Sequence, residues 1–290
     1  MVFAHPDDES FGMGGTIARY VASGVEVTYF CATAGEVGTI PDEMKDRYAT
    51  TKELRLAELD AAARVLNFKV ILGNYCDSGM MNSEHNQNPE SLWYQWEHYP
   101  AKVVRHVVDI IRQTQPQVVV TFNRYGGYGH PDHIAIQRAT LDAFDKAGDV
   151  AYVTDDAPYT PQKLYYTSIP GLPLKVMLGV MKLRGLDVRH MGTNKDIDFQ
   201  AVIDNLEPSH TSVDIRDYLY AWDEASACHA SQGGGMNRAF PIPMWLRRQI
   251  MGKQGFTRLI PRPTRDSIDE DDLFAAVQPE PLRKAAPVHD

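Results

Sequence analysis

One tetrapeptide occurs twice in nearly the same form, and this repetition constrains the fold more than any other feature of the chain. The two copies are His5-Pro6-Asp7-Asp8 and His130-Pro131-Asp132-His133. Each copy follows an apolar run and leads into a stretch with the hydrophobic spacing of a helix. If the two turns face each other, three histidines and three aspartates meet at one place.

Such a set of side chains suits a divalent transition metal, because imidazole and carboxylate both bind it and a mixed set leaves coordination positions open. In the first turn, Pro6 restrains the residue before it, so His5 leaves the strand in a defined direction. His5 and Asp8 are three residues apart and can converge on one ion. Asp7 then lies beside that ion, where it could take a proton from a metal-bound water molecule.

In the second turn, His130 and His133 have the same three-residue offset. By analogy with the first turn, the fourth residue, His133, is the metal ligand. His130 is left for acid chemistry or charge stabilisation, and Asp132 can hydrogen-bond an imidazole. A lone His-x-x-His is common on helix surfaces, but carboxylates clustered at two equivalent turns disfavour one another without a cation.

Strand and helix patterns alternate along the chain. Strands are predicted at residues 25–31 and 117–122, and helices at residues 51–66, from residue 100, and at residues 131–148. This order predicts an α/β, Rossmann-like fold with a mostly parallel sheet and helices on both faces. Ligands of such sheets bind at the C-terminal strand edge, where both turns lie. The first strand is very short, so the natural start is expected upstream of Met1.

The chain divides into one predicted domain at residues 1–260 and a Pro- and acid-rich C-terminal tail at residues 261–290, whose acidic run at residues 269–272 we expect to be solvated. Residues 73–98 form a long connection. Its aromatics Trp93, Tyr94 and Trp96 are expected to pin the connection to the core in preference to stacking on a sugar. Between residues 169 and 183, a helical stripe is compatible with a subunit interface, a lid or contact with an acyl chain, and its members are Leu174, Met177, Leu178 and Met181. We assign it to a homo-oligomer interface, since the acidic balance of the chain disfavours membrane attachment.

Composition excludes several classes of partner. With 29 basic and 38 acidic residues, the net charge of −9 disfavours a broad grip on nucleic acid or anionic lipid, although a local basic patch stays open. No signal peptide and no apolar run of membrane-spanning length is evident, so we expect no stable membrane insertion. Three scattered cysteines, Cys31, Cys76 and Cys228, indicate packed thiols in a reducing compartment and hence a cytoplasmic location.

Several motifs resemble the signatures of the LmbE/PIG-L deacetylases, which include N-acetylglucosaminylphosphatidylinositol deacetylase and the deacetylases and amidases of mycothiol and bacillithiol metabolism. The matching segments are Ala4-His5-Pro6-Asp7-Asp8-Glu9 with Gly12, Gly14 and Gly15, Arg55-x-x-Glu58, Asp77-Ser78-Gly79-Met80, Gly126-Gly127-Tyr128-Gly129-His130-Pro131-Asp132-His133, and His229-Ala230-Ser231-Gln232. The sequence departs from the family pattern at Asn123-Arg124-Tyr125, and residues 169–200 have no counterpart, which weakens any inference about the substrate.

The resemblance implies a role for each matching residue. His5, Asp8 and His133 would hold Zn²⁺, with Asp7 as general base. The remaining implied roles concern the substrate and the transition state: Tyr128 would polarise the amide carbonyl, His130, oriented by Asp132, would act as acid or electrostatic stabiliser, and Arg55 and Asp77 would contact the sugar.

The predicted function is therefore a metal-dependent hydrolase that deacetylates an N-acetylglucosamine-type conjugate, a small molecule. Two alternatives stay open: an amidase of a thiol-sugar conjugate on the same site, and a non-catalytic sugar-conjugate-binding protein with a vestigial metal site. Fe²⁺ in place of zinc would also suit two histidines and a carboxylate, as in an iron oxygenase. A dinucleotide site at Gly12-Met13-Gly14-Gly15 is disfavoured because Ile17 stands where the third glycine would be.

Overall fold

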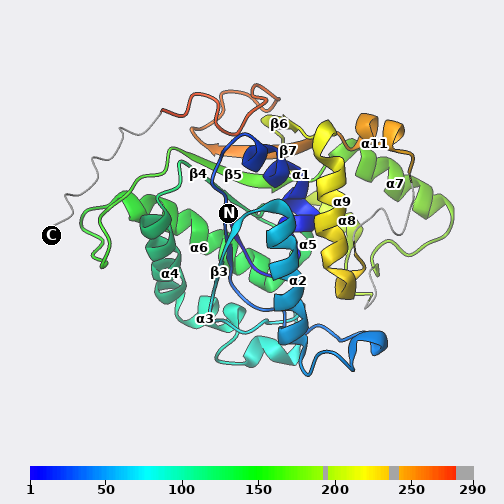
Figure 1. The fold of residues 1–290 in the computed structure, drawn as a ribbon, viewed down its shortest axis with the longest axis horizontal. Coiled ribbons are helices and arrows are strands. Elements are labelled where there is room, and N and C mark those ends of the chain that lie inside the picture. Colours follow the sequence, from blue (N-terminus) through cyan, green and yellow to red (C-terminus); the bar gives the residue numbers. More distant parts are fainter. Residues whose placement is uncertain (192–194, 235–241, 279–290) are drawn as a thin grey trace.

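Two β-sheets meet at the centre of the molecule, where strand β1 contacts strand β4 (Figure 1). The computed structural model describes residues 1–191, 195–234 and 242–278. The first sheet has the order β1 (Val2–Phe3), β2 (Thr28–Cys31) and β3 (Lys69–Leu72), with all neighbours parallel. The second has the order β4 (Val118–Thr121), β5 (Lys163–Ser168), β7 (Lys253–Ile260) and β6 (Thr211–Asp214). β4 and β5 are parallel, and β7 runs antiparallel to both of its neighbours.

Helices cover the sheets in two groups (Figure 1). One group packs together and contains α1 (Asp8–Ala22), α2 (Thr51–Leu66) and α9 (Leu219–Cys228). The other contains α3 (Leu92–His98), α4 (Pro100–Thr114) and α6 (Pro131–Gly148). Parallel neighbours need such crossover helices, and the direction of winding changes where β1 meets β4. The predicted α/β fold with helices on both faces is confirmed.

Local sequence signals explain where the main helices begin. The side chain of Thr50 accepts a hydrogen bond from the backbone N–H of Glu53 at 3.1 Å and so caps α2. Proline occupies the first position of both α4 and α6, where its missing N–H costs nothing. The helices predicted at residues 51–66 and 131–148 therefore match α2 and α6 in their bounds.

Further helices and turns lie outside these two groups in the described residues. They are α5 (Gly126–Gly129), α7 (Gly171–Leu183), α8 (Phe199–Asp204), α11 (Met244–Ile250) and the 3-10 turns Asp42–Met44, Glu84–Gln87, Arg216–Tyr218 and Ala230–Gln232. In the part of the chain that the structure describes, no helix has the length and apolar character needed to cross a membrane.

Two glycines of α1 allow close helix packing. A Cβ on Gly14 would lie 2.6 Å from the ring of Trp222 in α9, and a Cβ on Gly15 would lie 2.6 Å from the side chain of Ile215. Both distances are shorter than side-chain contacts allow. The glycine run therefore serves packing, which agrees with our rejection of a dinucleotide site.

The connection at residues 73–98 is more ordered than predicted. The side chain of Ser91 accepts a hydrogen bond from the N–H of Tyr94 at 3.3 Å, and helix α3 begins at the next residue. Trp93 and Trp96 pack against the hydrophobic core, so the expectation that they pin the connection is confirmed. The ring of Tyr94 instead stacks on His98, with centroids 3.9 Å apart.

The acidic run at residues 269–272 is solvated only in part, because Asp269 and Asp271 are exposed whereas Glu270 and Asp272 are half-buried. Glu270 forms ion pairs with Lys163 at 2.8 Å and Arg258 at 2.7 Å, and Asp272 accepts a hydrogen bond from Tyr20 at 2.8 Å. Leu273 is buried in the core. The run was interpreted by its charge alone, whereas its partners lie on β5, β7 and α1. Residues 279–290 of the predicted tail lie outside the described residues, and the boundary at residue 260 stays a prediction.

Candidate active site

The two His-Pro-Asp turns come together where β1 and β4 meet. His5 follows β1 after one residue, Ala4, and Pro131 begins α6 after the short helix α5 that follows β4. Ring nitrogens of His5, His130 and His133 lie within 4.8 Å of one another, and all three residues are buried. Ligand atoms of His5, His130, Asp77 and Asp132 form a second group of the same kind. The two turns therefore lie together in the structure, as the sequence predicted.

The three residues expected to bind metal lie close together, and Asp8 approaches the two histidines through different carboxylate oxygens. Nδ1 of His5 lies 3.0 Å from Nε2 of His133, which lies 3.4 Å from Oδ1 of Asp8. Nδ1 of His5 and Oδ2 of Asp8 are 3.9 Å apart. Ligands about 2.0–2.1 Å from a tetrahedral zinc ion are about 3.3 Å from one another. The residues present therefore fit a divalent metal in spacing and in donor type.

Neighbouring groups orient each of these donors. Nδ1 of His133 donates to the carbonyl of Gly126 at 3.0 Å, which leaves the lone pair of Nε2 for a metal. Oδ2 of Asp8 accepts hydrogen bonds from the backbone N–H of His5 at 2.8 Å and of Ala4 at 3.2 Å. On the far side of the His5 ring, Nε2 faces Oδ2 of Asp132 at 3.2 Å. Each ring is therefore held with one nitrogen toward the cluster.

Burial shifts the pKa values of these groups in ways that favour a cation. Burial raises the pKa of the Asp8 carboxyl to about 7, because a charged carboxylate is poorly solvated there. Burial lowers the pKa of His133 well below its ordinary value, which keeps that imidazole neutral and able to ligate. Burial also opposes protonation of His5, but Asp77 and Asp132 outweigh it and raise its pKa. A divalent ion would offset the negative charge of the cluster.

Asp7 has an unusual backbone conformation that is fixed by two buried residues. Its φ of 115° lies in the region that side chains rarely adopt. Its backbone N–H donates to Oε2 of Glu9 at 3.0 Å, and Oε1 of Glu9 lies 2.7 Å from Nε2 of His229. Glu9 and His229 are both fully buried. We did not predict this pair, although both residues stand within the motifs that carried the resemblance.

His130 and Asp132 are arranged differently from the sequence prediction. The carboxylate of Asp132 contacts His5 and Ser78, whose backbone N–H donates to it at 2.9 Å. His130 instead accepts, at Nδ1, a hydrogen bond from the backbone N–H of Asp132 at 3.2 Å. The proton of a neutral His130 therefore sits on Nε2. Burial lowers the pKa of His130 to about 3, which favours the neutral ring with its N–H on Nε2.

Comparison with known proteins decides the family. Residues 1–144, which contain both turns, match the family model described as PIG-L, GlcNAc-PI de-N-acetylase. The chain is 34% identical over 292 residues to the 1D-myo-inositol 2-acetamido-2-deoxy-alpha-D-glucopyranoside deacetylase of Geodermatophilus obscurus, with 96% of this chain and 97% of that protein covered. The chain belongs to the PIG-L/LmbE family.

Solved structures of similar fold include more than one chemistry. The N,N'-diacetylchitobiose deacetylase of Pyrococcus horikoshii superposes with a TM-score of 0.56 at 20% identity, covering 89% of this chain and 82% of that one. GalB, a 4-carboxy-2-hydroxymuconate hydratase of Pseudomonas putida KT2440, has a TM-score of 0.53 at 17% identity, covering 91% and 98%. At these identities the likeness establishes the fold alone, so the function of this PIG-L/LmbE protein must be argued from its site.

Two residues expected to contact the sugar lie inside the cluster of this family member. Nη2 of Arg55 is 2.7 Å from Oδ2 of Asp7 and also bonds the carbonyl of Pro6, which buries the guanidinium. Oδ1 of Asp77 lies 3.5 Å from Nε2 of His5 and 3.9 Å from Nε2 of His130. Their sugar-binding role stays a prediction, while the contacts they make in the structure are to catalytic candidates.

Tyr128, the residue expected to polarise the carbonyl, lies beside the histidines. Its ring centroid is 5.0 Å from that of His133 and 6.1 Å from that of His130. Burial and the neighbouring carboxylates of Asp8 and Asp7 raise its pKa well above the ordinary value, so the phenol keeps its proton. The Tyr128 hydroxyl is therefore a hydrogen-bond donor at neutral pH.

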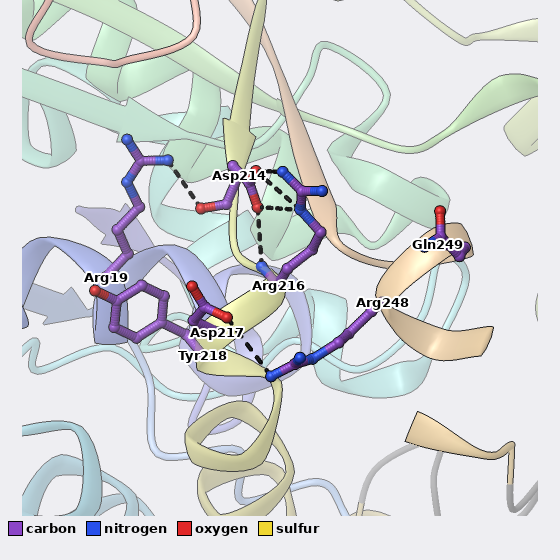
Figure 2. A pocket seen from close by; sticks show the side chains of 7 residues that line it. All are labelled: Arg19, Asp214, Arg216, Asp217, Tyr218, Arg248 and Gln249. Atoms are coloured by element: carbon purple, nitrogen blue, oxygen red, sulfur yellow. Dashed lines mark hydrogen bonds and ion pairs between the residues drawn. The ribbon is translucent and has the colours of Figure 1, made fainter. Parts of the chain in front are cut away.

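A separate hollow of about 510 Å³ on the PIG-L/LmbE protein lies near β6 and shares no residue with the metal cluster (Figure 2). Its arginines are already paired: Arg216 with Asp214, and Arg248 with Asp217 at 3.5 Å. Arg19 donates to the carbonyl of Asp214 at 2.8 Å. These pairings leave little uncompensated positive charge, and the hollow carries none of the chemistry of the turns.

Proposed function

We propose that the protein is a metal-dependent N-deacetylase that hydrolyses the acetamide of an N-acetylglucosamine-type conjugate. The observation that carries the proposal is the convergence of His5, Asp8 and His133, with donor atoms 3.0–3.9 Å apart, beside a carboxylate that is not needed as a ligand. That carboxylate is Asp7. The curated relative at 34% identity is itself described as a deacetylase of an N-acetylglucosamine glycoside.

His5, Asp8 and His133 would hold the ion through Nδ1, a carboxylate oxygen and Nε2, respectively. Three protein donors leave room for water and substrate, which is the arrangement of catalytic zinc sites. When bound, such an ion supplies a Lewis acid that lowers the pKa of water and polarises the amide carbonyl. We propose Zn²⁺, and Fe²⁺ is the alternative for the same donors.

Asp7 would take the proton from the attacking water. Its side chain is 16% exposed, whereas those of Asp8 and His5 are 9% and 6% exposed, so Asp7 is the most accessible of the three to water. Arg55 holds one carboxylate oxygen, and Glu9 holds the backbone N–H. The second oxygen of Asp7 is then presented in a fixed direction, as general base catalysis requires.

His130 and Tyr128 would stabilise the charge that develops on the carbonyl oxygen. Both offer a neutral N–H or O–H donor, since burial lowers the pKa of His130 to about 3 and raises that of Tyr128. Preorganised donors of this kind stabilise an oxyanion without being solvated. The departing amine would then receive from Asp7 the proton that Asp7 took from the attacking water.

The substrate is proposed from the relatives' descriptions. A 1D-myo-inositol glycoside of N-acetylglucosamine is the first compound to test, because 96% of this chain aligns with a deacetylase of that compound. An amidase of a thiol-sugar conjugate would use the same residues on a larger acyl group. A cytoplasmic location also stays a prediction from the cysteines.

The test combines metal analysis with an assay of acetate release. The purified protein is loaded with Zn²⁺ or Fe²⁺ and incubated with the inositol glycoside, with N-acetylglucosamine and with a thiol-sugar amide. We expect acetate and a free amine from the glycoside, and no O₂ consumption. Tight binding of the glycoside without acetate release would favour the non-catalytic alternative, and O₂ consumption by the iron-loaded protein would favour an oxygenase.

A further inference from the structure

Helix α7 has its apolar side chains on the outside. Leu172, Val176, Val180 and Leu183 are 75%, 59%, 44% and 89% exposed, and at 100° per residue they lie within about 80° of arc. Leu178, on the opposite face, is 3% exposed. A surface helix of a globular protein normally has polar residues on its outer face, so α7 is built for an apolar or amphipathic neighbour.

Positive charges flank this outer face. Lys175 and Lys182 lie on one edge of it, Arg184 ends the helix, and Arg189 follows, and all four side chains are exposed. Residues 171–190 contain a single carboxylate, Asp187, in a chain whose net charge is −9. The helix is therefore the local basic patch that composition left open, placed around an apolar face.

The positive charges around α7 distinguish between two possible neighbours, a second copy of the chain and an anionic lipid surface. The sequence predicted a homo-oligomer interface on the stripe of Leu174, Met177, Leu178 and Met181. In the structure Leu178 is buried, Leu174 and Met181 are half-buried and Met177 is exposed, so the more exposed apolar face is the one with Leu172, Val176 and Leu183. A two-fold contact between copies of that side would bring Lys175, Lys182 and Arg184 of one copy against those of the other, which is repulsive. An anionic lipid surface instead matches both the apolar face and its cationic edge.

We propose that α7 docks reversibly on the surface of an anionic lipid bilayer. Leu172, Val176 and Leu183 would enter the boundary between headgroups and acyl chains, and the lysines would pair with lipid phosphates. α7 packs against α8, and α8 packs against α5, the segment that contains Tyr128. The docking surface is thus two helices away from the candidate active site, but the proposal does not rest on the proposed function.

Sedimentation with vesicles tests the proposal directly. The full chain is mixed with vesicles of phosphatidylcholine and phosphatidylglycerol, or of phosphatidylcholine alone. We expect binding to the anionic vesicles that high salt weakens, because salt screens the lysines. The triple variant Leu172→Ser, Val176→Ser, Leu183→Ser should lower the partition coefficient by about tenfold or more. Lys175→Gln should lower it by about fivefold.

A matched control removes exposed apolar side chains elsewhere. Val150 and Val153 are 83% and 80% exposed in the connection after α6, and Val150→Ser with Val153→Ser should leave vesicle binding unchanged. All variants should keep the thermal unfolding midpoint and the acetate release of the wild type. Equal binding by the triple variant, or a wild-type dimer that the triple variant converts to a monomer, would overturn the proposal.

Discussion

The two His-Pro-Asp turns have almost the same sequence and enter their helices differently. In the first turn, α1 begins at Asp8, and Asp7 before it has a φ of 115°. In the second turn, α6 begins at Pro131, and His130 is the N-cap, accepting from the N–H of Asp132 at 3.2 Å. The helix therefore starts two positions earlier in the second copy, relative to the tetrapeptide.

This difference separates the third residues of the two turns. Asp7 points to Arg55 at 2.7 Å and is the most exposed carboxylate of its turn. Asp132 is fully buried and contacts Ser78 and His5. The fourth residues, Asp8 and His133, still meet at 3.4 Å. A repeated tetrapeptide thus brings the fourth residues of both copies together as candidate ligands, while the local backbone gives the third residues different contacts.

Substitution of the fourth residue of either turn should have the largest effect on metal binding and activity. Asp8→Ala and His133→Ala, one in each turn, should both abolish metal binding and lower activity by at least about a thousandfold, because each removes one of three donors. Metal content by atomic emission and acetate release are measured on each variant, with exposed His98→Ala as control. Full metal content in either variant would contradict the hypothesis that the two turns hold one ion together.

Asp7→Asn tests the third position of the first turn. We expect full metal content with activity lowered by about 10²–10⁴-fold, since the amide cannot take the proton of the attacking water. The measurement is kcat at saturating metal. A rate near that of the wild type would remove Asp7 as the general base.

Asp132→Asn tests the equivalent position of the second turn and should behave differently. The carboxylate orients His5, so its loss should weaken zinc affinity by about 10–100-fold, with activity partly restored by excess zinc. Zinc titration with a competing chelator gives the affinity. If Asp132→Asn lost activity at unchanged affinity, as expected for Asp7→Asn, the proposed difference between the third positions would be refuted.

The smallest expected effect is on stability. Zinc that binds only the folded chain at about 100 times its Kd should stabilise it by about 2.7 kcal/mol, which raises the unfolding temperature by about 4–5 °C. Asp7→Asn should keep this rise, and His133→Ala should lose it. Calorimetry with zinc and with a chelator makes the comparison, and a rise that persists in His133→Ala would place the stabilising ion elsewhere.

Much of the fold could be predicted because its signals are local. Thr50 and the two prolines Pro100 and Pro131 begin helices at the predicted residues, since a cap or a fixed φ acts within one turn. The burial of Glu270 and Asp272 in the acidic run was missed because their partners Lys163 and Tyr20 are more than 100 residues away in sequence.

The sequence predicted which residues meet at the candidate site better than it predicted the hydrogen bonds that those residues make. The spacing of His5, Asp8 and His133 indicates that they converge, and they do. The positive φ of Asp7 could not be predicted, because nothing in a His-Pro-Asp-Asp sequence distinguishes it from the second turn. Its cause is a hydrogen bond to Glu9, which in turn depends on His229, 220 residues later.

The Glu9 and His229 pair joins two segments that lie 220 residues apart in the chain. Until α9 and His229 have been synthesised, Glu9 has no cationic neighbour, and Asp7 is free to leave its strained geometry. We therefore expect a nascent or truncated fragment that stops before α9 to contain the four residues of the first turn and all of the second, yet to lack turnover. Acetate release by a fragment ending at residue 215 would show that assembly of the catalytic centre does not wait for the later part of the chain.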